Sequence, residues 1–258
     1  ESPASGWLKI FTSDIESKTI DLQKKVSIKS KSSTEKLWQY ENEGKNGFSF
    51  CPVAVNDDEI YIGNSDGELV ILSKDTGFEK RIIDLEEDIF KIKNSDGKIL
   101  IGSDDGIKSI NHIRKVIEWD ILPGKSVYSI SDINNGKMFA GCEDGYLYSI
   151  ESDSGLIDWH HTFDGPVYVS DTYNNKVFIA SEKKCYGINS EGRILWDFDA
   201  DGMITSPPIY KDGKVFFGSW DHKLYCLNEK DGSLIWSFQT EWGIDSSPDI
   251  SENTVYVG

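Results

Sequence analysis

The sequence predicts an all-β protein built from a repeat of about 39 residues, and three observations support this expectation. First, small residues end apolar runs at intervals of 39, 39, 39, 38 and 40 residues: Gly63, Gly102, Gly141, Ala180, Gly218 and Gly258. Second, tryptophans keep nearly the same period at Trp119, Trp159, Trp196 and Trp236, and Trp38 precedes Trp119 by 81 residues. Third, no segment of the length of a helix shows apolar residues spaced three and four apart.

Each repeat unit reads as four short strands. The first strand ends at Asn-Asn, Asn-Gly or Asp-Gly pairs, which supply the positive φ angles of a tight hairpin. The second is a continuous apolar run such as residues 215–217, which suits a strand buried on both faces. The third alternates between apolar and polar residues, as in 146–150, and the fourth carries the tryptophan.

A four-stranded sheet of this size cannot bury both of its faces alone, whereas stacking against neighbouring copies does so. A radial arrangement also leaves only short sheet edges. We therefore expect a β-propeller of four-stranded antiparallel blades, with seven or eight blades in the intact molecule and six as the other possible count. We expect one domain over residues 1–258, in which residues 1–34 form degenerate N-terminal strands and the last blade is incomplete at the C-terminus.

The N-terminal part leaves two possibilities open. Residues 35–41, with Trp38, read as a fourth strand, and the last unit stops at its second strand. Either the N-terminal strands complete that last blade, or the end of the blade lies outside this sequence.

The repeat resembles the PQQ-like repeat of quinoprotein alcohol dehydrogenases and of the lipoprotein of the outer-membrane assembly machinery. The resemblance covers about residues 30–258 and rests on a turn glycine four residues before a tryptophan in "SDSGLIDW" (152–159), "NSEGRILW" (189–196) and "EKDGSLIW" (229–236). It implies that these tryptophans dock between adjacent blades. The structural blade-docking residues are then Trp119, Trp159, Trp196, Trp236, Gly155, Gly192 and Gly232.

The N-terminal half departs from this pattern. Arg81 stands at a tryptophan position, Lys115 replaces a turn glycine, and Thr34 replaces another. We expect looser contacts between the blades there.

Composition argues against several classes of partner. The chain has 27 Lys and Arg against 44 Asp and Glu, a formal net charge of −17, with the basic residues interspersed among the acidic ones. No basic stripe is available for nucleic acid or an anionic membrane surface. No apolar stretch approaches the roughly 18 residues of a membrane span, so we expect no membrane insertion. The four cysteines (Cys51, Cys142, Cys185 and Cys226) are scattered, as ordinary buried thiols are.

The resemblance alone implies an extracytoplasmic or cell-surface location, and the sequence otherwise leaves localisation open. The chain begins with "ESPASG" and no Met, which is compatible with an upstream targeting segment.

The enzymatic interpretation, which the resemblance implies, is a dehydrogenase acting on an alcohol or sugar with PQQ and calcium in the central channel. The vicinal Cys-Cys pair common in such enzymes is absent, and no calcium shell can be assigned. The Asp-Gly pairs at 66–67, 105–106 and 144–145 fit hairpin turns, and "DADG" (199–202) fits a turn between blades better than a calcium loop. His160 and His161 are adjacent on a strand and point to opposite faces. We therefore predict no catalytic, cofactor-binding or metal-binding residue.

A candidate interaction patch remains. Trp220 and His222 lie in a turn between second and third strands, Glu241 and Trp242 lie in the following connection, and both loop types open on the same face of a propeller. Ser206, Asp245 and Ser246 are expected at the mouth of the channel. The favoured hypothesis is a non-catalytic scaffold that binds a protein or peptide through one face. The alternatives are the dehydrogenase and a ligand-sensing domain of a larger surface or signalling protein.

Overall fold

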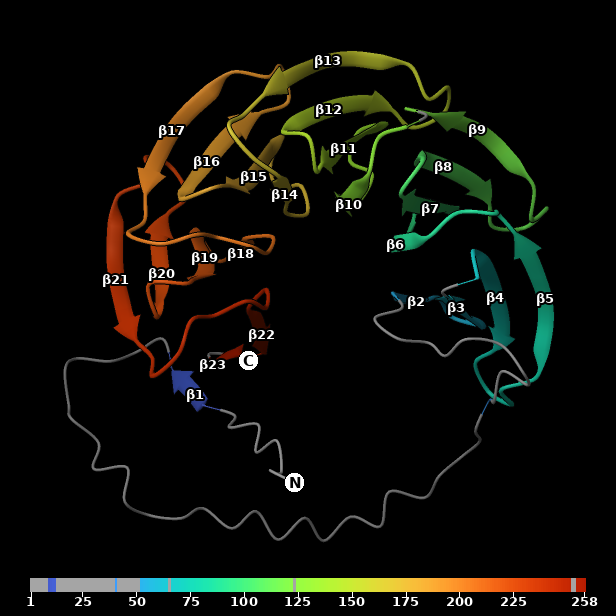
Figure 1. The fold of residues 1–258 in the computed structure, drawn as a ribbon, viewed down its shortest axis with the longest axis horizontal. Helices are drawn as coiled ribbons and strands as arrows, with labels where there is room; N and C mark the ends of the chain where they lie inside the picture. Colours follow the sequence, from blue (N-terminus) through green and yellow to red (C-terminus); the bar gives the residue numbers. More distant parts are fainter. Residues whose placement is uncertain (1–8, 13–39, 41–51, 65, 123, 252–253) are drawn as a thin grey trace, which may run out of the picture.

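The structure, a computed structural model, describes residues 9–12, 40, 52–64, 66–122, 124–251 and 254–258. The described residues form β-strands joined by turns, with no helix among them. The sheets are arranged about a central axis, each with its first strand innermost (Figure 1). The prediction of an all-β propeller is confirmed.

Five sheets are four-stranded antiparallel meanders in chain order. The first blade contains β2 (Val53–Val55), β3 (Glu59–Gly63), β4 (Glu68–Ser73) and β5 (Glu79–Asp84). The second contains β6 (Ile89–Ser95), β7 (Lys98–Ser103), β8 (Gly106–Asn111) and β9 (Ile117–Ile121). The third contains β10 (Val127–Ile130), β11 (Lys137–Cys142), β12 (Tyr146–Glu151) and β13 (Ile157–Thr162). The fourth contains β14 (Val167–Val169), β15 (Lys176–Ser181), β16 (Lys184–Asn189) and β17 (Ile194–Asp199). The fifth contains β18 (Ile209–Lys211), β19 (Lys214–Ser219), β20 (Lys223–Asn228) and β21 (Leu234–Gln239).

The sixth sheet joins the two ends of the chain. It contains β22 (Asp249–Ser251), β23 (Thr254–Val257) and the N-terminal strand β1 (Lys9–Thr12), which pairs antiparallel with β23. The N-terminal strand β1 thus adds to the last blade, which has three strands among the described residues. The described residues thus form six sheets, the lowest of the counts considered, and seven or eight are not reached within them.

Most of the N-terminal segment lies outside the described residues, including Trp38, Thr34 and the remainder of residues 1–34 apart from β1. Tyr40 is described, and its hydroxyl donates to the Glu79 carboxylate at 2.6 Å. This contact places Tyr40 beside the outer strand β5 of the first blade.

The hairpins between first and second strands have the backbone that their sequences predict. Asn135 and Gly136 have φ angles of 50° and 74°, and Asp212 and Gly213 have 48° and 77°. Positive φ at both central residues is the geometry whose twist matches that of paired strands. The Asp-Gly pairs at 66–67, 105–106 and 144–145 also lie in turns, between second and third strands.

The second strand of each blade lies in the core. In β19, Val215 and Phe217 are buried against the fourth blade, whereas Phe216 packs toward Val255 and Val257 of the sixth sheet. Successive residues of a strand point to opposite faces, so a continuous apolar run supplies both interfaces. The hydrophobic core is therefore a series of interfaces between blades.

The small residue that ends the second strand is required by the next blade. A Cβ added at Gly141 would lie 2.2 Å from the Val167 carbonyl oxygen, and one at Gly218 would lie 2.1 Å from a methyl group of Ile244. At Gly141 the start of the inner strand β14 crosses directly over the glycine, and at Gly218 the connection that leads to β22 does so. This crossing explains why the period of about 39 residues is marked by glycine or alanine.

The tryptophans lie between adjacent blades. The indole N–H groups of Trp119, Trp159 and Trp196 donate to the carbonyl oxygens of Ser152, Ser190 and Glu229, at 2.8, 3.0 and 3.0 Å. Each acceptor belongs to the next blade. Trp236 instead packs on Phe216 with ring centroids 5.9 Å apart.

The turn glycine of each of these blades packs against the tryptophan of the preceding blade and not against the tryptophan of its own blade. Gly155 has a φ of 71°, and a Cβ there would lie 3.0 Å from the Trp119 ring. Gly192 faces Trp159 and Gly232 faces Trp196 in the same way. Glycine is thus needed twice, for the left-handed backbone and for the approach of the indole.

Candidate protein-binding face

Two kinds of loop meet at one end of the blades, which we call the loop end: the turns between second and third strands, and the connections between blades. In the fifth blade the amide of Thr240 donates to the His222 carbonyl at 2.7 Å, and that of Ile244 donates to the Ser219 carbonyl at 3.1 Å. These bonds join residues 219–222 to residues 240–244.

Trp220 is fixed at this end although its side chain is 54% exposed. Its indole N–H donates to the Asp245 carboxylate, which also accepts from the Thr205 hydroxyl at 3.4 Å. Two glycines press against its backbone: a Cβ at Gly202 would lie 2.4 Å from the Asp221 amide nitrogen, and one at Gly243 would lie 3.2 Å from the Trp220 Cα. The loops can carry Trp220 in this position because both neighbours lack a side chain.

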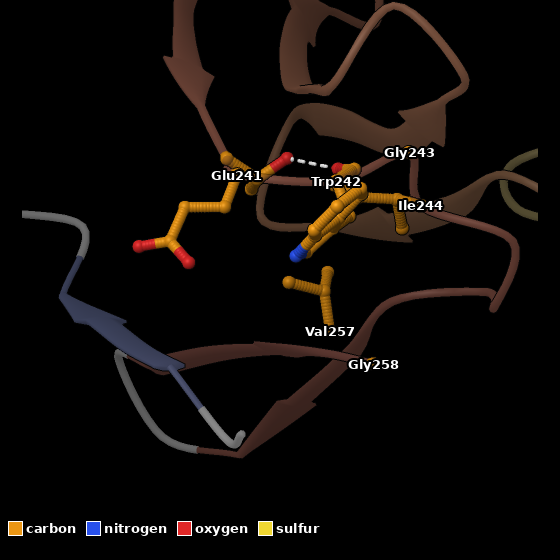
Figure 2. A pocket seen from close by; sticks show the side chains of 7 residues that line it. Glu241, Trp242, Gly243, Ile244, Val257 and Gly258 are labelled. Atoms are coloured by element: carbon orange, nitrogen blue, oxygen red, sulfur yellow. Dashed lines mark hydrogen bonds between the residues drawn. The ribbon is translucent and has the colours of Figure 1, made fainter. Parts of the chain in front are cut away.

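Trp242 is the more exposed of the two indoles, at 78%. The Thr240 hydroxyl donates to the Trp242 carbonyl at 2.6 Å, and it also contacts the His222 carbonyl at 2.8 Å. Figure 2 shows the indole above Val257, while the Glu241 side chain extends away from it. The indole borders a pocket of about 120 Å³ lined by Thr240, Glu241, Trp242, Gly243, Ile244, Val257 and Gly258.

The structure places the other residues of the candidate patch as follows. His222 is exposed in its turn with a φ of 65° and is linked to the Trp242 loop through Thr240. Ser246 is exposed, and its hydroxyl donates to the Gly258 carbonyl at 3.2 Å. Ser206 is only 5% exposed, and its hydroxyl has no hydrogen-bond partner within the described part of the chain. Ser206 therefore lies beneath this face and not on the mouth of the channel where the sequence placed it.

The physical reason for the burial of Ser206 is the crossing of neighbouring blades. The corresponding serine of the third blade, Ser129, donates to the Val167 carbonyl at 3.1 Å and accepts from the Val169 amide at 2.9 Å. Ser129 thus faces the backbone of the next blade, and the equivalent Ser206 is buried in the same way.

The sequence pointed to Asp245 but not to the set of loop-end residues to which Asp245 belongs. In the second to sixth sheets one residue directly follows the apolar residue with which the chain enters the blade, either at the start of the inner strand or five residues before it: Phe90, Tyr128, Tyr168, Thr205 and Asp245. We call these five residues the rim. Their spacing of 38, 40, 37 and 40 residues was present in the sequence, but their common location depends on how each inner strand enters its blade.

The aspartates and histidines that could suggest a metal site instead contact other residues of the protein. In the segment "DADG", Asp201 pairs with Lys223 at 2.8 Å and Asp199 pairs with Lys184 at 3.3 Å. His160 and His161 lie on opposite faces of β13, where His160 contacts the rings of Tyr146 and Tyr148 and His161 donates to the Gly192 carbonyl. No group of three or more His, Cys, Asp or Glu residues suited to a metal ion occurs among the described residues.

The cysteines are buried apart from one another. Burial raises the pKa of the thiols of Cys142 and Cys226 to about 12. Cys185 is buried as well, and Cys51 lies outside the described residues. The three described thiols are therefore protonated near neutral pH.

Radial four-stranded blades define the class of this protein as a β-propeller, and its turn glycines and docked tryptophans resemble those of PQQ-like repeats. Within that class, the family described as "Outer membrane protein assembly factor BamB" matches residues 181–258. The resemblance drawn from the repeat is thus confirmed.

Individual relatives agree with this class. The chain is 26% identical over 123 residues to the outer membrane protein assembly factor BamB of Moranella endobia, covering 42% of this chain and 32% of that protein. It is 29% identical over 89 residues to the dehydrogenase subunit of the quinone alcohol dehydrogenase of Gluconobacter oxydans, covering 26% of this chain and 12% of that protein. The matches therefore span a third or less of these relatives.

Solved structures show the fold. BamB from Moraxella catarrhalis superimposes with a TM-score of 0.53 at 14% identity, covering 80% of this chain and 81% of that one. The computationally designed Ika8 protein gives a TM-score of 0.71 at 14% identity, covering 80% and 69%. Among the described residues no helix has the length and apolar character to cross a membrane.

Proposed function

We propose that this protein is a non-catalytic propeller that binds a protein or peptide partner through its loop end. The observation that carries the proposal is the pair of exposed indoles, Trp220 and Trp242, on loops that are held in place by hydrogen bonds and close glycine contacts. Exposed, preorganised tryptophans are typical anchors of protein interfaces, because they bury a large apolar area at little cost in conformational entropy.

The relatives support the same class of function. Those named outer membrane protein assembly factor carry in that name a role in assembling other proteins. By analogy we place this protein outside the cytoplasm or at the cell surface, with a protein as its partner.

A second candidate is a quinone-dependent dehydrogenase, favoured by the relatives that bear that name. The described residues do not supply a carboxylate set for a calcium ion, since the acids of "DADG" are paired with lysines. Adding PQQ and Ca²⁺ and measuring tryptophan quenching together with dye-linked oxidation of alcohols separates the two candidates. Saturable quenching with turnover would establish the dehydrogenase.

Site-specific photo-crosslinking tests the proposed function. A photoreactive amino acid at position 242 reports on the loop end, and one at position 156, where Leu156 is exposed at the opposite end of the blades, is the matched control. We expect position 242, and not position 156, to yield one dominant crosslinked partner in cells that produce this protein.

The purified partner then allows a quantitative comparison of two double variants. Trp220→Ala/Trp242→Ala should weaken binding at least tenfold, whereas Phe78→Ala/Leu156→Ala, which removes exposed apolar side chains from the opposite end, should change it less than twofold. Equal crosslinking from both ends, or equal affinity of both variants, would refute the proposed face.

A further inference from the structure

We propose that the rim, together with Glu143 and Glu182, binds a lysine- or arginine-bearing segment of the partner. This inference rests on the proposed function and adds to it the chemistry of the bound segment. Trp220 donates to Asp245, itself a member of the rim, so the rim is continuous with the indole at the same end of the blades.

The rim combines aromatic rings with carboxylates in neighbouring blades. Phe90 and Tyr128 are in contact, with ring centroids 4.8 Å apart, and both are half-buried. Glu143 directly follows β11 in the same blade, where its amide donates to the Ser126 carbonyl at 2.9 Å, two residues before Tyr128. Tyr168 follows in the fourth blade, and the charges of Glu143 and Glu182 both act on it. Aromatic and acidic groups thus occur together in the third and fourth blades.

Electrostatics at Tyr128 and Tyr168 support this placement. Burial and the negative charge of Glu143 raise the pKa of both phenols, and Glu182 adds to the effect at Tyr168. Glu182 is itself held close to the connection before β14, because a Cβ at Gly165 would lie 2.2 Å from its carboxylate oxygen. The two carboxylates therefore share one negative region around the tyrosines.

Within the described residues, Asp245 of the rim and the neighbouring acids Glu143 and Glu182 have no cationic partner in the protein. None of Glu143, Glu182 and Asp245 forms an ion pair within the described ranges, although nearby acids do: Asp144 pairs with Lys125, and Asp201 pairs with Lys223 at 2.8 Å. Lys91 follows Phe90 on β6, but the charges that act on it are those of Lys93 and Asp171. The protein leaves these acids available to an external cation.

A basic side chain satisfies both components of the rim. A guanidinium or ammonium group over a tyrosine face gains cation–π energy, and a neighbouring carboxylate adds a charge-assisted hydrogen bond. The net charge of −17 further attracts a basic segment over long range. Charge complementarity thus selects a basic segment over an acidic or purely apolar one.

Fluorescence anisotropy with synthetic peptides tests the inference. The probes are two labelled dodecapeptides, one of alternating Arg and Ser and one of alternating Glu and Ser, each titrated with the full chain at low salt. We expect saturable binding of the Arg peptide alone, weakened about tenfold in Glu143→Gln/Glu182→Gln. Tyr128→Leu should weaken it several-fold through loss of the cation–π contact.

The matched control removes the same charge from the other end of the blades. Asp75→Asn/Glu191→Gln neutralises two exposed acids in turns between third and fourth strands and should change the affinity less than twofold. Equal weakening by both double variants would reduce the binding to attraction by net charge and overturn the inference. Circular dichroism and unchanged urea midpoints establish that the variants fold.

The two proposals fail in different ways. Suppose the crosslinked partner loses affinity for Trp220→Ala/Trp242→Ala but binds Glu143→Gln/Glu182→Gln like the wild type. The binding face then stands and the rim chemistry is wrong. If the Arg peptide binds the rim as expected while positions 242 and 156 crosslink alike, the rim stands and the tryptophan face fails.

Discussion

Lys115 of the second blade reaches across to Glu59 of the first blade, and its ammonium group lies 3.2 Å from the Tyr61 hydroxyl. Lys115 stands where the third, fourth and fifth blades have Gly155, Gly192 and Gly232, and it adopts the same left-handed backbone, with a φ of 55°. Arg81 stands where the preceding blade would supply a tryptophan. The tryptophan position of the first joint between blades is therefore occupied by a polar cluster, in which Lys80 also contacts Glu59 at 3.2 Å, while the rest of that joint is apolar.

This polar cluster predicts an acid-sensitive contribution to stability. Burial opposes ionisation of Glu59, but hydrogen bonds from Lys115, Tyr61 and Lys80 outweigh it and lower the pKa of Glu59 from 4.5 to about 2. A carboxyl group with a depressed pKa stabilises the folded state above its unfolded pKa, and that contribution is lost as pH falls from about 4.5 toward 2. We expect the urea midpoint of the wild type to fall more between pH 6 and pH 3 than that of Glu59→Gln. The exposed Glu191→Gln serves as control, and an identical loss in Glu59→Gln would contradict the prediction.

The docked tryptophans should dominate stability. Trp119→Phe removes the N–H that satisfies the buried Ser152 carbonyl and should cost about 1–3 kcal/mol, and Trp119→Ala should cost about 3–5 kcal/mol. Trp242→Ala, which removes a largely exposed indole, should change the free energy of unfolding by less than about 0.5 kcal/mol. Urea denaturation followed by circular dichroism measures all three. A Trp242 effect as large as that of Trp119 would show that the docking contact has been misjudged.

Glycine at the end of the second strand is required sterically. Gly141→Ala would bring a methyl group to within 2.2 Å of the Val167 carbonyl oxygen, which belongs to backbone and cannot rotate away. We expect a loss of about 1–3 kcal/mol in the free energy of unfolding. The reverse change in the next blade, Ala180→Gly, should cost about 1 kcal/mol, because it adds backbone freedom in the unfolded chain and removes one buried methyl group without creating a steric clash. If the two variants had the same unfolding midpoint, this result would argue against the close crossing of the blades.

The pairing of β1 with β23 predicts that the N-terminus protects the last blade. Removing residues 1–12 deletes the strand that pairs with Thr254–Val257. Hydrogen exchange followed by mass spectrometry should then show faster exchange in β23, with β19 and β20 of the fifth blade unchanged. Unaltered protection of β23 in the truncated chain would rule out this pairing.

Much of the fold could be predicted from the sequence because the repeat carries it. The spacing of Gly63, Gly102, Gly141, Ala180 and Gly218 predicted the blades, and turn pairs such as Asn135-Gly136 predicted the hairpins. These features are local, since φ preferences and the alternation of side chains along a strand act within a few residues.

The candidate site was only partly predictable. The shared loop end of Trp220 and Trp242 follows from the order of strands, but the bond between Trp220 and Asp245 depends on a contact over 25 residues. Ser206 was misplaced because a neighbouring blade determines its burial. The rim was missed because its residues differ in type, so that only their common position in the folded blades relates them.

The sequence by itself determined that this chain forms small antiparallel sheets that must cover one another, because each unit has apolar residues on both faces and turns at fixed intervals. Only the tertiary structure decided which residues of different blades contact one another. Gly155 contacts Trp119, β1 joins β23 across the whole chain, and Glu143 and Glu182 from separate repeats both act on Tyr168. The physical reason is that these contacts form between different repeat units. The spacing of residues within one unit does not specify which residues of another unit will lie beside them.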